Sequence, residues 1–80
     1  MSATIQTHVD LDCKNLLCPM PIIKIAQAIK LVPIGGTVRM EATDPGSKYD
    51  IAAWARQTGQ ELVETEQNGR VYTFLVKRTR

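Results

Sequence analysis

The sequence predicts a two-layer α/β sandwich of the α+β class, with the element order β-α-β-α-β-β. Three observations predict it: two segments of alternating apolar and polar residues, two segments with apolar residues at helical spacing, and an Asn-Gly pair between two strand-like runs. Strands joined through a helix are expected to be parallel with a right-handed crossover. Both helices then cover one face of a four-stranded mixed sheet, and the other face is left for solvent or a partner.

The first strand is predicted at residues 9–13, after a loose N-terminal tail over residues 1–8. Val9, Leu11 and Cys13 alternate with two aspartates, which is typical of a half-buried strand. Because Cys13 is in phase with the apolar residues, we interpret it as part of the core. Residues 9–80 form a single domain, since 80 residues leave no room for a second one.

The first helix is predicted from Pro19, because Ile22, Ile25, Ile29 and Val32 recur at spacings of three and four. Proline and two glycines at 33–36 end the helix and turn the chain. Residues 37–43 alternate again and predict the second strand, with Met40 in phase with the core.

The second helix is predicted after the turn DPGS, with Trp54 on its buried face and Gly59 at its end. Ser47 and Asp50 have the spacing of a capping box. Two strands then close the chain, and Asn68-Gly69 between them predicts a type I′ hairpin turn. The basic residues Lys77, Arg78 and Arg80 are interpreted as a solvated tail.

Composition excludes several functional classes. The net charge of +2 is too small to indicate nucleic-acid binding, and no apolar run is long enough to cross a membrane. The first residues lack the pattern of a secretory signal, so we expect a cytoplasmic protein with reduced thiols. The two cysteines and one histidine are too few for a structural zinc site, so no metal is expected.

The stretch LLCPMPIIK carries the candidate functional residue, Cys18. With Cys18 as N-cap, Pro19 and Pro21 occupy the first helical turn, where proline has no hydrogen bond to lose. Met20 would then be the natural amide donor toward Cys18. The positive end of the helix dipole favours a thiolate, so we expect the pKa of Cys18 to lie below the free value of about 8.5, with Lys24 adding a weaker contribution.

The residues that would complete a cysteine enzyme are missing. The chain has one histidine, His8, in the predicted tail, and it has no C-x-x-C pair. An activated cysteine without a base is suited to receiving a group from one partner and passing it to another. The pattern therefore favours a group carrier over an enzyme that acts alone.

The motif CPMP and the later DPGS–DIAAWARQTG resemble the TusA/SirA-like family of small sulfur-carrier proteins, and the similarity runs from Val9 to Lys77. Its C-P-x-P cysteine and prolines correspond to Cys18, Pro19 and Pro21. Many relatives have an acidic residue where this chain has Met20. Relatives often have glycine shortly before the cysteine, where this chain has Asn15, which suits a left-handed backbone.

The resemblance implies a sulfur carrier that holds a persulfide on Cys18 and needs no cofactor. It implies a donor, either a cysteine desulfurase or a rhodanese-like protein, and an acceptor sulfurtransferase. The pathways served in the family include tRNA thiolation, molybdenum-cofactor biosynthesis and sulfur oxidation or thiosulfate use. We expect a monomer, with Asp44 and Lys48 as candidate docking residues beside Lys24.

Two other hypotheses remain open. Cys13 and Cys18 could form a reversible disulfide in a redox-sensing interaction module. A nucleic-acid-binding module could use Tyr72 and Phe74, but their alternation predicts that both rings face the helices, so no direct nucleic-acid contact is expected.

Overall fold

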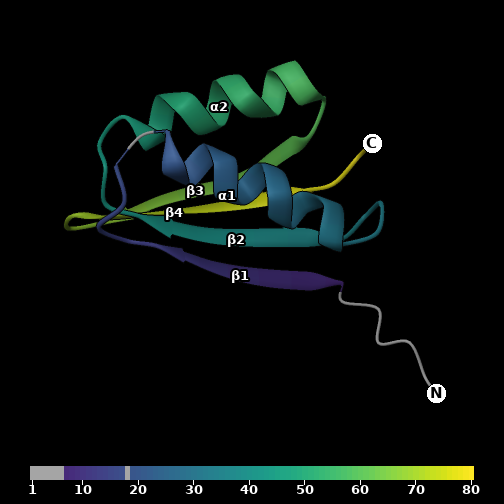
Figure 1. The fold of residues 1–80 in the computed structure, drawn as a ribbon, viewed down its shortest axis with the longest axis horizontal. Coiled ribbons are helices and arrows are strands. Elements are labelled where there is room, and N and C mark those ends of the chain that lie inside the picture. Colours follow the sequence, from purple (N-terminus) through teal and green to yellow (C-terminus); the bar gives the residue numbers. More distant parts are fainter. Residues whose placement is uncertain (1–6, 18) are drawn as a thin grey trace.

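The computed structural model describes residues 7–17 and 19–80, and its α-helices and strands follow the predicted order (Figure 1). The first helix was predicted to run to Val32, but its α-helical part ends at Ala28 and a 3-10 helix follows. Most of the predicted tail, residues 1–6, lies outside the described residues, as does Cys18. The helices and strands, in chain order, are β1 (His8–Cys13), α1 (Met20–Ala28), the 3-10 helix η1 (Ile29–Leu31), β2 (Thr37–Ala42), α2 (Ser47–Thr58), β3 (Glu61–Asn68) and β4 (Val71–Lys77).

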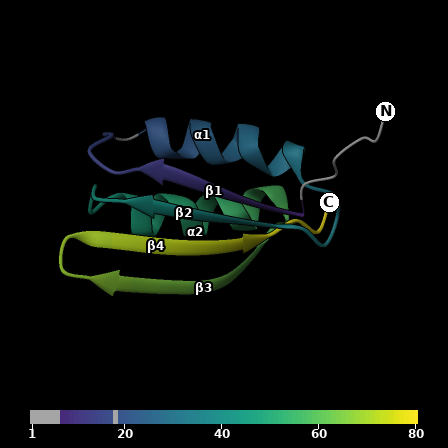
Figure 2. The same cartoon turned by 90° about the horizontal axis from the view of Figure 1, so that it is seen from below.

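The four strands form one mixed sheet in the order β1-β2-β4-β3. β1 and β2 are parallel, whereas β4 pairs antiparallel with both β2 and β3. Figures 1 and 2 show α1 and α2 on the same face of this sheet, which confirms the predicted layers. The last strand therefore lies at the centre of the sheet, next to β2.

The first strand begins one residue earlier than predicted, at His8. The Thr37 amide donates to the Thr7 carbonyl at 2.9 Å, and the His8 ring lies 2.7 Å from the Thr37 hydroxyl and 2.9 Å from Asp10. These contacts extend the parallel ladder to the end of β2. His8 is consequently part of the sheet and does not belong to the tail.

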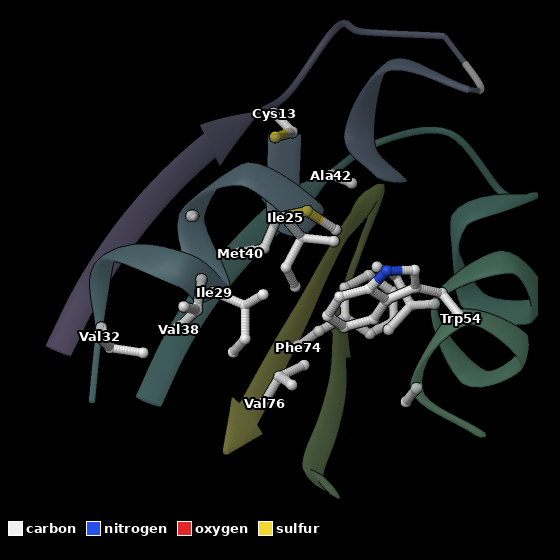
Figure 3. Close-up of a cluster of buried hydrophobic side chains, with 13 residues drawn as sticks. Cys13, Ile25, Ile29, Val32, Val38, Met40, Ala42, Trp54, Phe74 and Val76 are labelled. Carbon is white, nitrogen blue, oxygen red and sulfur yellow. The ribbon is translucent and has the colours of Figure 1, made fainter. Parts of the chain in front are cut away.

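The core lies between the helices and the sheet (Figure 3). Cys13 and Met40 are completely buried, and Trp54 is 8% exposed, so all three predictions of packing residues are confirmed. Phe74 is also completely buried, and Tyr72 packs against the core, as the alternation of β4 predicted. Among the described residues, no helix is long and apolar enough to span a membrane.

The hairpin turn differs from the predicted type I′ turn. Asn68 still pairs with Val71, so the turn consists of Gly69 and Arg70. Gly69 has φ +63°, but Asn68 and Arg70 are not at positive φ, which fits a type II′ turn with glycine in its first central position. Leu62 is opposite Val76, but a β-bulge between Leu62 and Glu64 then shifts the register of β3 by one residue. Because of this shift, Asn68 pairs with Val71 and two residues remain in the turn.

The start of α2 also differs from the predicted capping box. Gly46 is the N-cap, and within residues 7–17 and 19–80 no side chain caps the helix. Ser47 is a buried first residue whose hydroxyl has no hydrogen-bond partner in that part of the chain. Asp44 organises the turn, because its carboxylate accepts from the Gly46 amide at 3.0 Å and its carbonyl from the Ser47 amide at 2.9 Å. Asp44 thus closes the turn that leads to Ser47, and the predicted pair of Ser47 and Asp50 does not cap the helix.

The interpretation of the C-terminal basic residues as a solvated tail is wrong for Arg78. Its side chain donates to the main-chain oxygens of Val32 at 2.7 Å and Arg80 at 2.8 Å, and its amide donates to the Gly36 carbonyl. Arg78 thus connects the end of β4 to the segment that follows η1.

Candidate functional site

Three loops meet at one edge of the sheet. β1 and β2 are parallel, and their last residues, Cys13 and Ala42, are paired, so the loops that follow both strands leave the same edge. Ala42 is also paired with Tyr72, which lies next to the hairpin turn at Gly69 and Arg70. The edge therefore combines residues 14–19, residues 43–46 and the tip of the β3–β4 hairpin.

These loops enclose a cleft of about 340 Å³, lined by Asn15, Leu16, Leu17, Thr43, Asp44, Pro45 and Arg70. Asn15 has φ +67°, a left-handed conformation in which asparagine is tolerated in place of the glycine of many relatives. Its amide donates to the Thr43 hydroxyl at 2.9 Å. This bond joins the first loop to the second and fixes the direction in which the chain enters α1.

The amino end of α1 begins one residue later than predicted. Pro19, with φ −97° and ψ 13°, is the N-cap, whereas Cys18 was predicted there, and Pro21 is the second helical residue. The carbonyl of Pro19 accepts from the amides of Ile22 and Ile23, both at 3.1 Å. Both prolines still lie where a missing N–H costs no helical hydrogen bond, so the physical reason for the motif is unchanged.

The Met20 amide does not have the predicted role. It donates to the Leu17 carbonyl at 2.9 Å, which closes a turn across the motif. This N–H is therefore used within the backbone, and the helix end can favour an anion through its dipole but not through the Met20 amide.

Cys18 itself lies outside the described residues, but its two neighbours in the chain are described. Leu17 lines the cleft, and Pro19 lines a separate groove of about 310 Å³ between the first turn of α1 and α2, together with Ile22, Asp50, Ala53, Trp54 and Gln57. Leu17 is 76% exposed, and Pro19 and Met20 are exposed as well. The described neighbours of Cys18 are thus exposed, and Leu17 and Pro19 line two separate hollows.

The second cysteine has a different environment. Cys13 is a free thiol that is completely buried at the end of β1, beside Ala42 (Figure 3). Burial raises the pKa of the Cys13 thiol, with a further increase from Asp12, while Lys24 opposes the change. The side chain is therefore protonated at neutral pH and is a poor nucleophile.

The other predicted site residues are only partly brought together. Asp44 lines the cleft, and it has further contacts beyond the Gly46 amide. Lys48 is exposed in the first turn of α2 and does not line the cleft. Lys24 is exposed on α1, and it lies near enough to Cys13 to oppose part of the increase in the pKa of that thiol.

Arg70 was missed by the sequence analysis. Among the described residues, Arg70 is the one cation that lines the cleft, together with Leu17 and Asp44. The Asn-Gly signal located the hairpin, but only the pairing of β2 with β4 shows that its tip reaches this edge.

The fold and this edge define a class of protein: a small two-layer α+β domain that presents a C-P-x-P cysteine between exposed residues. Residues 9–78 match the sulfurtransferase TusA family. The chain is 39% identical over 70 residues to the sulfur carrier protein TusA of Allochromatium vinosum, covering 88% of this chain and 92% of that protein. It is 41% identical to a putative sulfur carrier protein of Halobacterium salinarum over the full length of both chains.

A solved structure has the same fold. The SirA-like protein of Desulfitobacterium hafniense superposes with a TM-score of 0.78 at 22% identity, covering 90% of this chain and 99% of that one. The chain therefore belongs to the TusA family of sulfurtransferases, and the predicted family and fold class are confirmed.

Proposed function

We propose that this protein carries sulfane sulfur as a persulfide on Cys18 and passes it to a partner protein. The observation that carries the proposal is the position of the motif in a chain of the TusA family: Leu17 and Pro19, which flank Cys18, are exposed and line two different hollows. A sulfur that is exchanged between proteins must be reachable by both of them, and the exposure of the residues on either side of Cys18 supports this requirement.

Loading is a thiol exchange in which no net oxidation occurs. The Cys18 thiolate attacks the outer sulfur of a persulfide on the donor, the S–S bond of the donor breaks, and the donor leaves as a thiolate. The persulfide proton stays on the transferred sulfur or is lost to water. In delivery, a thiolate of the acceptor attacks the same outer sulfur, and Cys18 leaves as the thiolate.

The amino end of α1 supports an anion at this position. Met20 is the first helical residue, two positions after Cys18, so the positive end of the helix dipole lies close in the chain. The first turn contains no acidic residue that would oppose it, and the two charges of the segment from Met20 to Leu31 are Lys24 and Lys30. The helix therefore favours the thiolate and the persulfide anion over their neutral forms.

Apolar side chains supply the contact with partner proteins. Leu17, Met20 and Ile23 are 76%, 41% and 44% exposed and follow one another at intervals of three residues. Large exposed apolar residues beside a reactive group are typical of an interaction surface. We infer that both the donor, a cysteine desulfurase or a rhodanese-like protein, and the acceptor sulfurtransferase dock here, in the cytoplasm and on a monomeric carrier.

The pathway follows from the identity of these partners and is proposed to be one of tRNA thiolation, molybdenum-cofactor biosynthesis, or sulfur oxidation and thiosulfate use. The disulfide alternative is less well supported, because Cys13 is completely buried and its pKa is raised. A switch would require this thiol to leave the core each time the disulfide forms.

The proposal is tested by loading the purified protein from a cysteine desulfurase with cysteine, or from a rhodanese with thiosulfate. Mass spectrometry should show an increment of about 32 Da, one sulfur atom, which a reductant removes. Cys18→Ala should show no increment, and Cys13→Ala should load like the wild type. An unchanged mass with both donors, or an increment that persists in Cys18→Ala, would refute the proposal.

A further inference from the structure

A third hollow lies between the carboxyl-terminal halves of the two helices and is lined by no described residue of the CPMP motif. It has a volume of about 210 Å³ and is lined by Ala26, Ile29, Lys30, Trp54, Thr58, Gln60, Arg78 and Arg80. None of these residues lines the cleft beside Leu17, and only Trp54 is shared with the groove beside Pro19. The sulfur-transfer chemistry proposed above makes no use of this cavity.

The floor of the cavity is apolar and already formed. Ile29 is 5% exposed and Trp54 is 8% exposed, and Trp54 extends from α2 toward the sheet (Figure 3). An engineered apolar cavity of about 150 Å³ accepts benzene, so a single aromatic ring or a short branched chain fits the volume found here. Residues of both helices line the cavity, which is already open in this structure.

The rim of the cavity is positively charged. Lys30, Arg78 and Arg80 all line it, whereas no aspartate or glutamate does so among the residues that the structure describes. In the described ranges 7–17 and 19–80, none of the three cations forms an ion pair with an aspartate or glutamate, and Arg78 Nε donates to the main-chain oxygen of Arg80 at 2.8 Å.

The polar side chains of the rim form hydrogen bonds within the protein, and some of their N–H groups remain available to a ligand. Arg78 donates through Nε to the main-chain oxygen of Arg80 and through one terminal N–H to the carbonyl of Val32. These two bonds hold the guanidinium in place, and its remaining N–H groups are available to a ligand. Gln60 accepts from the Thr79 amide with its side-chain oxygen at 2.8 Å, so its NH₂ is the group that remains. Thr58 donates its hydroxyl proton to the Trp54 carbonyl at 2.7 Å.

We propose that this cavity binds a small carboxylic acid, with its apolar group against Trp54 and Ile29 and its carboxylate toward Lys30, Arg78 and Arg80. An apolar floor with a few converging polar groups is the usual form of a small-molecule site. A fixed guanidinium binds a carboxylate at a lower entropic cost than a mobile one. The protein therefore has a ligand site that is separate from its sulfur site.

The first test is a titration with 3-phenylpropionate, followed by the fluorescence of Trp54, the single tryptophan of the chain. We expect a saturable change with a dissociation constant on the order of 1 mM, as suits a ligand of this size. The uncharged 3-phenyl-1-propanol should bind at least about tenfold more weakly, because it cannot form charge-assisted hydrogen bonds. A linear, non-saturating response, or equal affinity for acid and alcohol, would overturn the proposal.

Variants locate the site. Lys30→Gln and Arg80→Gln should each weaken binding by about three- to tenfold, as expected for the loss of one partly exposed cation. Arg56→Gln is the matched control, because Arg56 is an exposed cation of α2 that does not line the cavity. If Arg56→Gln weakens binding as much as Arg80→Gln, the carboxylate is attracted by net charge alone and the site is refuted.

A filling variant tests the cavity itself. Ala26→Leu should abolish the fluorescence change by occupying the space beside Trp54, and a thermal unfolding curve verifies that the variant is folded. Undiminished binding by a folded Ala26→Leu protein would exclude this cavity. Cys18→Ala should bind 3-phenylpropionate like the wild type, so a failure of this proposal and a failure of the carrier proposal give different results.

Discussion

Replacement of Cys13 should cost stability without affecting sulfur loading. The Cys13 side chain is completely buried at the end of β1 and belongs to the core cluster. Cys13→Ala removes one buried heavy atom, a change similar in size to Ile→Val, and should lower the free energy of unfolding by about 1 kcal/mol. Cys13→Ser preserves the size of the side chain but buries a hydroxyl among apolar groups, at a cost of about 1–3 kcal/mol.

The two variants are compared by thermal unfolding monitored by circular dichroism. For a domain of this length, 1 kcal/mol corresponds to a shift of roughly 4–8 °C in the midpoint. We therefore expect Cys13→Ala to unfold about 5 °C lower than the wild type, and Cys13→Ser about 10 °C lower. The order of the two variants matters more than either value, because a hydrophobic environment penalises the hydroxyl and not the methyl group.

The same samples are then loaded with sulfur below their unfolding temperature. Both should gain the mass of one sulfur atom to the same extent as the wild type, because no step of the proposed transfer uses Cys13. Serine that proves as stable as cysteine would refute the apolar environment of this position. Loss of loading in a folded Cys13→Ala protein would refute the structural role and favour the disulfide hypothesis.

Three further predictions concern pH, docking and the turns. Burial raises the pKa of Cys13, so the stabilisation due to its neutral thiol is complete below its unfolded pKa of about 8.5 and is lost as pH rises through the folded pKa. Above a pH of about 8.5, the free energy of unfolding measured in urea should therefore fall less steeply with pH for Cys13→Ala than for the wild type. Leu17→Asp should slow sulfur transfer to an acceptor protein by about tenfold or more, while chemical persulfidation by a small polysulfide stays unchanged. The control Leu31→Asp, at a position that is 65% exposed and distant from the motif, should change neither rate. Gly69→Ala should cost about 1 kcal/mol for its positive φ alone, whereas Gly36→Ala should cost more, because its Cβ would lie 2.7 Å from the Val32 Cβ and 2.9 Å from the Pro33 carbonyl; equal midpoints in urea would contradict this ranking.

Local sequence patterns were sufficient for the type and order of the elements. Alternation over residues 9–13 and helical spacing from Ile22 to Val32 each report which side of a segment is buried, and burial is decided within a few residues of chain. The two prolines beside Cys18 predicted a helix start for the same reason, since the missing N–H and the fixed φ are properties of proline itself. The helix boundary was wrong by one residue, because the turn between Leu17 and Met20 is closed by a backbone bond that no side chain announces.

The sequence by itself thus determined the elements, their buried faces and the cysteine that is proposed to carry sulfur. Only the tertiary structure decided which strands are neighbours, and therefore that Arg70 reaches the cleft and that Arg78 and Arg80 line a cavity with Trp54. The physical reason is that strand pairing joins residues that are distant in the chain, as with Ala42 and Tyr72. Such pairs are selected by the packing of the whole domain, and no local periodicity encodes them.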